Sequence, residues 1–115
     1  MPMDCIFCKI ANKEIPSNLV YEDDQIVAFP DNDPQAPTHI LIIPRQHIDT
    51  INQLDSDKSA LISHMVLTAT QLAKDLALAD DGYRLVWNCN RQGGQAVFHI
   101  HLHLLGGRTM HWPPG

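Results

Sequence analysis

The chain has 115 residues, 44% of them hydrophobic and 18% charged, a balance typical of a globular domain. Its net charge of −5 argues against a protein that coats nucleic acid, because affinity for a phosphate backbone comes from clustered Lys and Arg. No apolar run approaches the roughly 20 residues of a membrane span, and the first residues show no signal-peptide pattern. Three cysteines are too few for a disulfide framework. We therefore expect a single cytoplasmic domain over residues 1–115, with neither a membrane nor a nucleic-acid polymer as partner.

The first half of the chain predicts short elements separated by turns. Apolar residues recur at helical spacing near the N-terminus, and a polar turn then separates two short apolar runs. A loop rich in proline follows, and after it comes a β-branched run typical of a buried strand. In chain order we predict a helix over 5–14, strands over 18–22 and 25–29, a loop over 31–37 and a strand over 39–44.

The second half contains one long predicted helix, which Asp55, Ser56 or Asp57 caps and Gly82 ends. Its apolar face consists of residues at steps of three and four, namely Leu61, Met65, Ala69, Leu72 and Leu76. We then predict a strand over 84–88, a loop over 90–95, a strand over 97–105 and a Pro-rich tail. Most of the strand connections are too short for parallel crossovers, so the order predicts an α+β fold with an antiparallel sheet.

The last predicted strand alternates histidine with aliphatic residues. His99, His101 and His103 therefore share one face, because successive side chains of a strand point to opposite sides. A solvated polar face is one interpretation, but Thr, Lys or Glu would serve such a face equally well. Three histidines in register instead indicate either imidazole ligands for zinc or phosphate chemistry with one imidazole as nucleophile.

The loop directly before this strand favours phosphate chemistry. It reads NRQGGQ over 90–95, and paired glycines let backbone N–H groups approach an anion closely. A lone Gly-Gly is a weak signal. Gly-Gly-Gln followed within ten residues by the histidine row is a much stronger one.

Three segments of the chain resemble one family. GGQAVFHIHLHLLGG is similar to the His-x-His-x-His motif of the histidine triad (HIT) superfamily, in which x is apolar. DNDPQAPTHILIIPRQHI resembles the matching nucleotide-binding segment, and GGRTMHWPPG resembles the C-terminus of the Hint branch. The resemblance implies a HIT-like antiparallel sheet of about five strands with one long and one short helix, dimerising into a continuous sheet.

The same resemblance implies a purine nucleotide-binding hydrolase that cleaves the P–N bond of adenosine 5′-phosphoramidates and related AMP conjugates. Its ligands would be AMP, GMP or the phosphoramidate substrate. His101 falls on the nucleophile that forms a covalent nucleotidyl-histidine, and His103 falls on the phosphate-binding position. His39 falls on a histidine that orients the triad, and His99 is the first triad histidine. No cofactor is required for this chemistry, because imidazoles and backbone amides supply the positive field at the phosphate.

The nucleotide-binding positions implied by the resemblance form three groups. Asp31 would accept hydrogen bonds from the ribose hydroxyls. Gln95 and Asn88 fall on the phosphate side, where Gly94, Ala96 and Val97 also lie. The apolar purine pocket would consist of Phe7, Ile10, Ile15, Phe29 and Leu41, although each of these residues alone also fits a core.

Two positions depart from the family pattern. Ala96 stands where many Hint proteins have a serine near the leaving group, so the route by which the departing amine is protonated differs. Asn32 stands where an aliphatic residue often lines the ribose pocket. Neither departure touches the nucleophile.

The CxxC pair, Cys5 and Cys8, has two interpretations: reduced thiols packed as small hydrophobes, or half of a metal site. The resemblance implies the second, a structural zinc held by both cysteines, His47 and His99. Such a closed set of two thiolates and two imidazoles is not catalytic. Cys89 is predicted to be a packed thiol, and His64 a residue of the long helix's face.

The resemblance also implies a homodimer in which the tail, residues 106–115, contacts the partner and Trp112 reaches the partner's nucleotide site. A disordered tail is the alternative. Two other functions stay open at this point: a nucleotide-binding dimer that serves as an interaction or regulatory protein with incidental turnover, and a zinc-dependent hydrolase that uses the triad as metal ligands.

Overall fold

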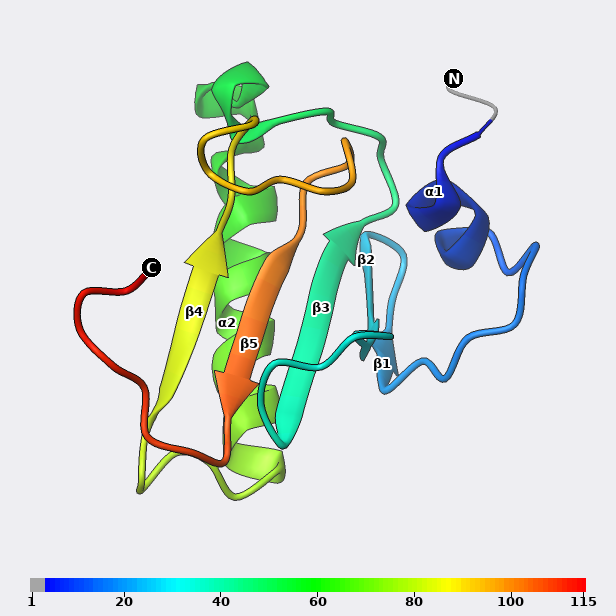
Figure 1. Cartoon of the computed structure of the whole chain (residues 1–115). Helices are drawn as coiled ribbons and strands as arrows, with labels where there is room; N and C mark the ends of the chain where they lie inside the picture. Colours follow the sequence, from blue (N-terminus) through cyan, green and yellow to red (C-terminus); the bar gives the residue numbers. More distant parts are fainter. Residues whose placement is uncertain (1–3) are drawn as a thin grey trace.

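In the described part of the chain, five antiparallel strands form one sheet in the order β1-β2-β3-β5-β4 (Figure 1). The computed structural model describes residues 4–115. The strands are β1 (Tyr21–Glu22), β2 (Ile26–Pro30), β3 (Thr38–Pro44), β4 (Tyr83–Trp87) and β5 (Leu102–Gly106). The helices are α1 (Ile6–Ala11) and α2 (Ser59–Asp75), and two 3₁₀ turns, Ile51–Gln53 and Ser56–Lys58, precede α2. This is the predicted antiparallel α+β fold with one long and one short helix.

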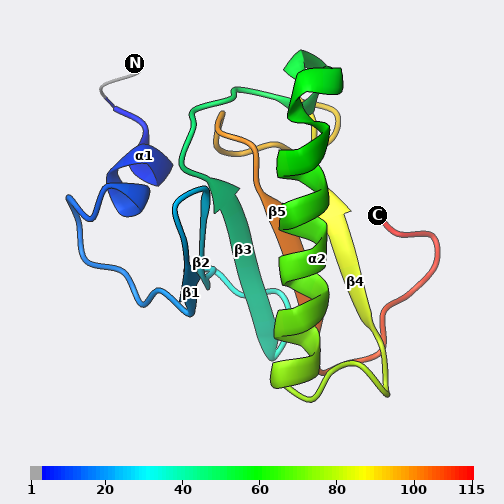
Figure 2. The ribbon, with the colours of Figure 1, turned by 180° about the vertical axis from the view of Figure 1, so that it is seen from behind.

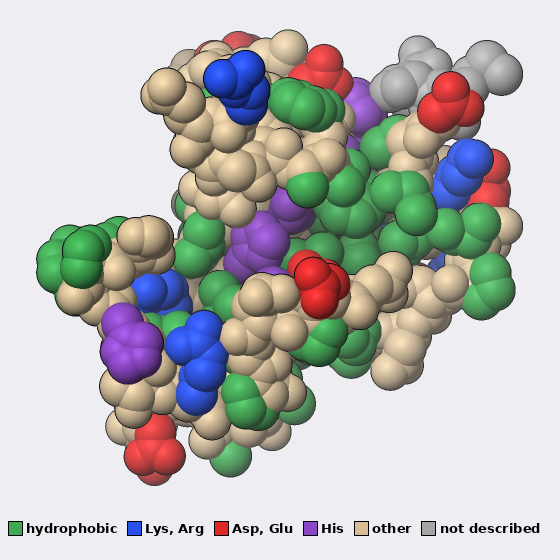
Figure 3. Space-filling view, in the orientation of Figure 1, with side chains coloured by type: hydrophobic (Ala, Val, Ile, Leu, Met, Phe, Trp, Pro, Cys, Tyr) green, Lys and Arg blue, Asp and Glu red, His purple; other side chains and the backbone are tan. Residues whose placement is uncertain are grey.

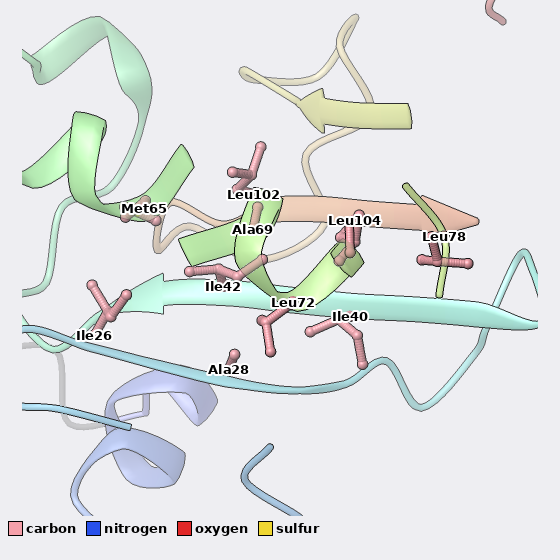
Figure 4. Packing of buried hydrophobic residues seen from close by; sticks show 11 residues of the cluster. Ile26, Ala28, Ile40, Ile42, Met65, Ala69, Leu72, Leu78, Leu102 and Leu104 are labelled. Atoms are coloured by element: carbon pink, nitrogen blue, oxygen red, sulfur yellow. The ribbon is translucent and has the colours of Figure 1, made fainter. Parts of the chain in front are cut away.

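Helix α2 covers one face of the sheet and encloses the main core (Figure 2). Alternate residues of β2, β3 and β5 point toward α2, as the period of two along a strand requires. Figure 4 shows Met65, Ala69 and Leu72 of α2 lying over these strands. Within residues 4–115, neither helix is long and apolar enough to cross a membrane.

The opposite face of the sheet carries the histidines and a second apolar cluster. There α1 packs over Val27 and Phe29 of β2 and over Leu41 and Ile43 of β3. His103 of β5 lies on this face, paired with Leu41 on one side and Val86 of β4 on the other. The fold therefore places the catalytic candidates opposite α2, beside α1.

The predicted strand over 97–105 is wrong in its first half, because pairing begins only at Leu102. Extending the ladder with β3 would place Pro44 opposite Ile100, and proline has no N–H to donate. Ile100 instead donates to the carbonyl of Ile48 at 2.8 Å. His99 and His101 nevertheless lie on the same side as α1, because both imidazoles pack edge-on against Phe7.

The predicted end of the long helix is also wrong, since α2 stops at Asp75, well before Gly82. Ala77 takes a positive φ of 60°, and the N–H of Leu78 bonds back to the carbonyl of Ala73 at 2.8 Å. This closing turn buries Leu78 in the core and leaves Leu76 44% exposed, outside the apolar face. Gly82, at φ 101°, serves the turn before β4.

Candidate active site

A cavity of about 330 Å³ opens between α1, the sheet and the loop before β5. In Figure 3 it is the hollow where histidines lie among hydrophobic side chains. Most of the predicted site residues line it: Phe7, Ile10, Ile15, Phe29, Asp31, Asn32, Leu41, Asn88, Gly94, Ala96, Val97, His101 and His103. Three further lining residues were missed by the sequence reasoning, namely Ile6, Pro16 and Ser17.

The cavity is lined by an apolar group and a polar group of side chains, which meet where Phe7 packs against His101. Phe7 and Phe29 meet edge to face, with ring centroids 5.6 Å apart, and lie with Ile10 in the second apolar cluster. The polar group consists of the carboxylate of Asp31 and the imidazoles of His101 and His103. The apolar group provides the kind of surface that an aromatic base stacks on, and the polar group suits a sugar phosphate.

The backbone fixes which nitrogen of His101 carries the proton. Nδ1 lies 2.8 Å from the carbonyl oxygen of His99, and a carbonyl only accepts, so Nδ1 carries the proton. The neutral ring then has its lone pair on Nε2. The Phe7 ring makes a T-shaped contact with the imidazole, with ring centroids 5.1 Å apart, and supports it from the side of α1. His101 therefore has the tautomer that a nucleophilic imidazole requires.

A second chain of hydrogen bonds fixes His39 and His103. The backbone N–H of Gln35 donates to Nδ1 of His39 at 3.0 Å, so the proton of His39 is on Nε2. This Nε2 lies 2.9 Å from Nδ1 of His103 and 3.5 Å from a carboxylate oxygen of Asp31. His103 thus accepts at Nδ1 and carries its own proton on Nε2. The Asn88 amide nitrogen lies 3.5 Å from that Nε2, and because two N–H groups cannot bond each other, this tautomer requires Asn88 to turn its amide oxygen toward His103. His103 can therefore donate a hydrogen bond to an anion.

All three imidazoles are held in the neutral form. Burial lowers the pKa of His39 and of His101, and the charge of Asp31 opposes that effect only in part. Burial, followed by the neighbouring His101 and His39, lowers the pKa of His103 to about 4. A neutral His101 keeps the lone pair that attack requires.

The loop before the strand owes its shape to its glycines and to Gln95. A Cβ at Gly93 would lie 2.5 Å from the carbonyl oxygen of Cys89, and Gly94 has a φ of 80°. The Gln95 side chain is buried, accepts from the N–H of Asn90 at 2.8 Å and donates to the carbonyl of Asp49 at 2.7 Å. It lies outside the cavity lining, so the structure gives Gln95 a place in holding the loop.

Trp112 also lies outside the lining and is 83% exposed. His64 is on the helix face as predicted, but it is bonded, with Nε2 2.7 Å from a carboxylate oxygen of Asp23. Sequence reasoning missed that contact, since Asp23 is 41 residues away and no local pattern links the two.

The structure brings the four predicted metal ligands together. Sγ of Cys5 lies 3.3 Å from Nδ1 of His99, and Sγ of Cys8 lies 3.3 Å from Nδ1 of His47 and 3.6 Å from that of His99. All four ligand atoms lie within 4.8 Å of one another. Ligands of a tetrahedral zinc, at about 2.1 to 2.3 Å from the ion, are about 3.4 to 3.8 Å apart. The donor set and its spacing therefore fit a zinc ion.

The outer contacts of this cluster also fit a metal. Nε2 of His99 lies 2.7 Å from the carbonyl oxygen of Pro44, and Nε2 of His47 bonds the carboxylate of Asp49. Both outer nitrogens therefore donate, which leaves each Nδ1 with a free lone pair toward the two sulfurs. Without a metal, burial and the adjacent Cys5 raise the pKa of the Cys8 thiol to about 11.

Asp31, His39 and His103 form a second group whose side-chain atoms lie close enough to hold a metal. Their tautomers argue against that use. Nε2 of His39 carries a proton because Nδ1 already accepts from Gln35, and Nδ1 of His103 accepts that proton's hydrogen bond. The three triad histidines also do not converge on one point, because His99 belongs to the cysteine cluster and His101 to neither group. This geometry does not fit a hydrolase that uses the triad as metal ligands.

Comparisons with known proteins show the family to which the chain belongs. The HIT domain family model matches residues 12–110. A purine nucleoside phosphoramidase of Escherichia coli (strain K12) is 50% identical over 110 residues, which cover 96% of this chain and 92% of that protein. An uncharacterized HIT-like protein of Synechococcus elongatus is 49% identical over the full length of both chains. The crystal structure of a HIT family hydrolase from Legionella pneumophila matches with a TM-score of 0.96 and 57% identity, covering 97% of this chain and 100% of that one. The chain therefore belongs to the HIT family and is a hydrolase of that family.

Proposed function

We propose that this hydrolase cleaves the P–N bond of adenosine 5′-phosphoramidates and related AMP conjugates through a covalent intermediate on His101. The observation that carries the proposal is the tautomer of His101, whose Nδ1–H bonds the carbonyl of His99 and whose lone-pair nitrogen belongs to a ring that lines the cavity. The similarity to a purine nucleoside phosphoramidase supports the same reaction.

In the first step, Nε2 of His101 attacks the α-phosphorus and a P–N bond to imidazole forms. The bond to the substrate amine breaks, and the amine nitrogen leaves with the bonding pair and takes up a proton. In the second step, water attacks phosphorus and breaks the bond to His101, which yields AMP and restores the neutral imidazole. The Nδ1–H···O=C bond to His99 supports the positive charge that the ring carries while it is bonded to phosphorus.

The neighbouring groups have matching roles in this proposal. His103, protonated on Nε2, donates to a phosphate oxygen, and His39 holds it in that tautomer. The Asp31 carboxylate accepts from the ribose hydroxyls, and the apolar group of the cavity lining takes the purine. Ala96 provides no hydroxyl for the departing amine, and we assign the donation of that proton to water.

We also propose that Cys5, Cys8, His47 and His99 hold a structural zinc. A bound zinc would tie the N-terminus of α1 to the segment before β5, which is the part of the chain that lacks strand pairing. No step of the reaction uses it. The homodimer, the contact of the tail with a partner and the cytoplasmic location stay predictions of the same proposal.

The test compares wild type with His101→Gln in a strong chelator, using an adenosine 5′-phosphoramidate as substrate. We expect wild type to release AMP and His101→Gln to lose about 10³-fold or more of that rate, because the nucleophile is absent. AMP affinity measured by calorimetry should change little. Intact mass spectrometry after quenching in alkaline denaturant, which preserves a P–N bond to imidazole, should show an AMP adduct on wild type alone.

The matched control is His64→Gln, which removes a histidine on the far face of the sheet and should keep the wild-type rate. Sustained turnover by His101→Gln contradicts the proposal. Tight AMP binding by a wild type that never releases product would favour a nucleotide-binding interaction protein.

A further inference from the structure

Arg108, an exposed residue of the tail, connects the tail to the loop over residues 31–37. Its Nε donates to the carbonyl oxygen of Gln35 at 3.0 Å, and its Nη1 donates to the carbonyl of Thr109 at 3.1 Å. The adjacent Gly107 lies against Pro37, where a Cβ would meet the proline ring at 2.9 Å. The guanidinium therefore fixes the position of Gln35 from outside the cavity.

The other side of Gln35 faces the histidines. Its N–H donates to Nδ1 of His39, and His39 in turn donates from Nε2 to Nδ1 of His103. The Gln35 side chain also bonds the carbonyl of Asp33 at 3.0 Å, which holds the residue within its own loop. A continuous line of hydrogen bonds thus runs from Arg108 through Gln35 and His39 to His103.

The direction of donation along these hydrogen bonds decides whether His103 presents an N–H group or a lone pair to a phosphate. If Gln35 moves away, Nδ1 of His39 no longer has its donor, and the ring can carry its proton on Nδ1. Nε2 of His39 then accepts from His103, and His103 turns a lone pair, not an N–H, toward the phosphate oxygen. A lone pair facing an anion repels it, so the transition state loses a donor.

We propose that Arg108 is a positioning residue of the active site, which keeps His39 and His103 in the donating tautomer through the backbone of Gln35. The proposal rests on the proposed function for its effect on turnover, but its effect on the tautomers does not depend on turnover. Because Arg108 is exposed, its substitution leaves the core untouched.

The test is Arg108→Met, which keeps an apolar stem and removes every donor. We measure the ¹⁵N shifts of the imidazole nitrogens by NMR in the ligand-free protein, together with kcat and KM. In wild type, Nδ1 of His39 and of His103 should report as unprotonated. In Arg108→Met both rings should show mixed tautomers, and kcat should fall about tenfold, less than loss of a direct acid–base group costs. Arg108→Lys, which can still donate to Gln35, should recover most of both signals.

The matched control is Arg84→Met. Arg84 also holds the tail, through a bond from Nη2 to the carbonyl of His111 at 2.9 Å, but it does not contact Gln35. Arg84→Met should leave the ¹⁵N shifts of the His39 and His103 imidazoles as they are in wild type. Unchanged shifts in Arg108→Met, or equal changes in both variants, overturn the proposal. If wild type shows no phosphoramidase activity, the proposed function fails while the NMR measurement still decides the role of Arg108.

Discussion

His99 and His101 stand two residues apart in the same segment, and the backbone uses them in opposite ways. His99 gives its Nε2–H to the carbonyl of Pro44 and leaves Nδ1 toward Cys5 and Cys8. His101 gives its Nδ1–H to the carbonyl of His99 and leaves Nε2 as the lone-pair nitrogen. Both rings are buried and both have a lowered pKa, with burial as the main cause.

The difference teaches that the position of one carbonyl oxygen decides which imidazole nitrogen keeps its lone pair, Nδ1 in His99 and Nε2 in His101. The two uses are also physically linked. The carbonyl that orients His101 belongs to His99, and Phe7 of α1 packs against both rings. His99, which belongs to the cysteine cluster, therefore also helps to hold the ring of His101 in place.

We expect the largest effect from Cys8→Ser, which removes one of the two thiols that face Nδ1 of His99. Loss of a thiolate ligand should abolish zinc binding and lower the free energy of unfolding by about 3 kcal/mol in zinc-containing buffer, because metal bound only by the folded state stabilises that state. Metal content after dialysis and the Tm with and without chelator measure both effects. Turnover should fall far less than in His101→Gln.

The control is Cys89→Ser, since Cys89 lies outside the cluster. It should keep the metal content and the chelator-dependent shift in Tm of wild type. If chelator shifts the Tm of wild type and of Cys8→Ser by the same amount, the cluster does not hold the stabilising ion.

We expect an effect of intermediate size from pH, which acts on His103, the neighbour of His101 in the cavity lining. Its pKa is lowered from 6.5 to about 4 in the folded chain, with burial as the main cause. The unfolded chain therefore binds more protons between these values, and stability is full above pH 6.5 and falls as pH drops toward 4. His103 should contribute about 1 to 2 kcal/mol of this loss by pH 5.

Urea unfolding between pH 7.5 and pH 5 measures that loss, with His103→Gln as the comparison. The variant should lose less stability over this range than wild type, because a glutamine does not titrate. Histidines that do not touch His103 contribute equally to both proteins, so the difference between the two curves reports on His103 together with its coupling to His39 and His101. Identical slopes would contradict the assignment.

The sequence predicted the parts of this site that depend on local pattern. The alternation of histidines and aliphatic residues predicted their common side, and the family motifs predicted which residues line the cavity. The strand over 97–101 was wrong because its pairing depends on Pro44, a residue of a distant strand that has no N–H to offer. The bonds to Gln35 and Asp23 were missed because they join backbone or side-chain groups across loops, and no spacing rule encodes them.

We expect the smallest effect at a third histidine, His64, whose hydrogen-bond partner is a side chain instead of a backbone carbonyl. His64 differs from His99 and His101 because its partner is a carboxylate, Asp23, which a substitution can remove. The same carboxylate also accepts from the hydroxyl of Tyr21 at 2.7 Å and from the N–H groups of Gln25 and Ile26. Burial alone would raise the pKa of Asp23, but these hydrogen bonds outweigh it and hold that pKa well below its usual range.

Asp23→Asn should therefore lower the free energy of unfolding by about 1 kcal/mol at pH 7, because an amide nitrogen cannot accept from Tyr21 and His64. The folded-state pKa of Asp23 is depressed, so its stabilisation is present above about pH 4 and is lost as pH falls below that, where wild type and variant should converge. His64→Gln should cost a similar amount, and the double variant should cost less than the sum of the two. Asp24→Asn, at the adjacent exposed carboxylate, should change stability by less than about 0.5 kcal/mol. Additive losses in the double variant would show that His64 and Asp23 do not stabilise the fold as a pair.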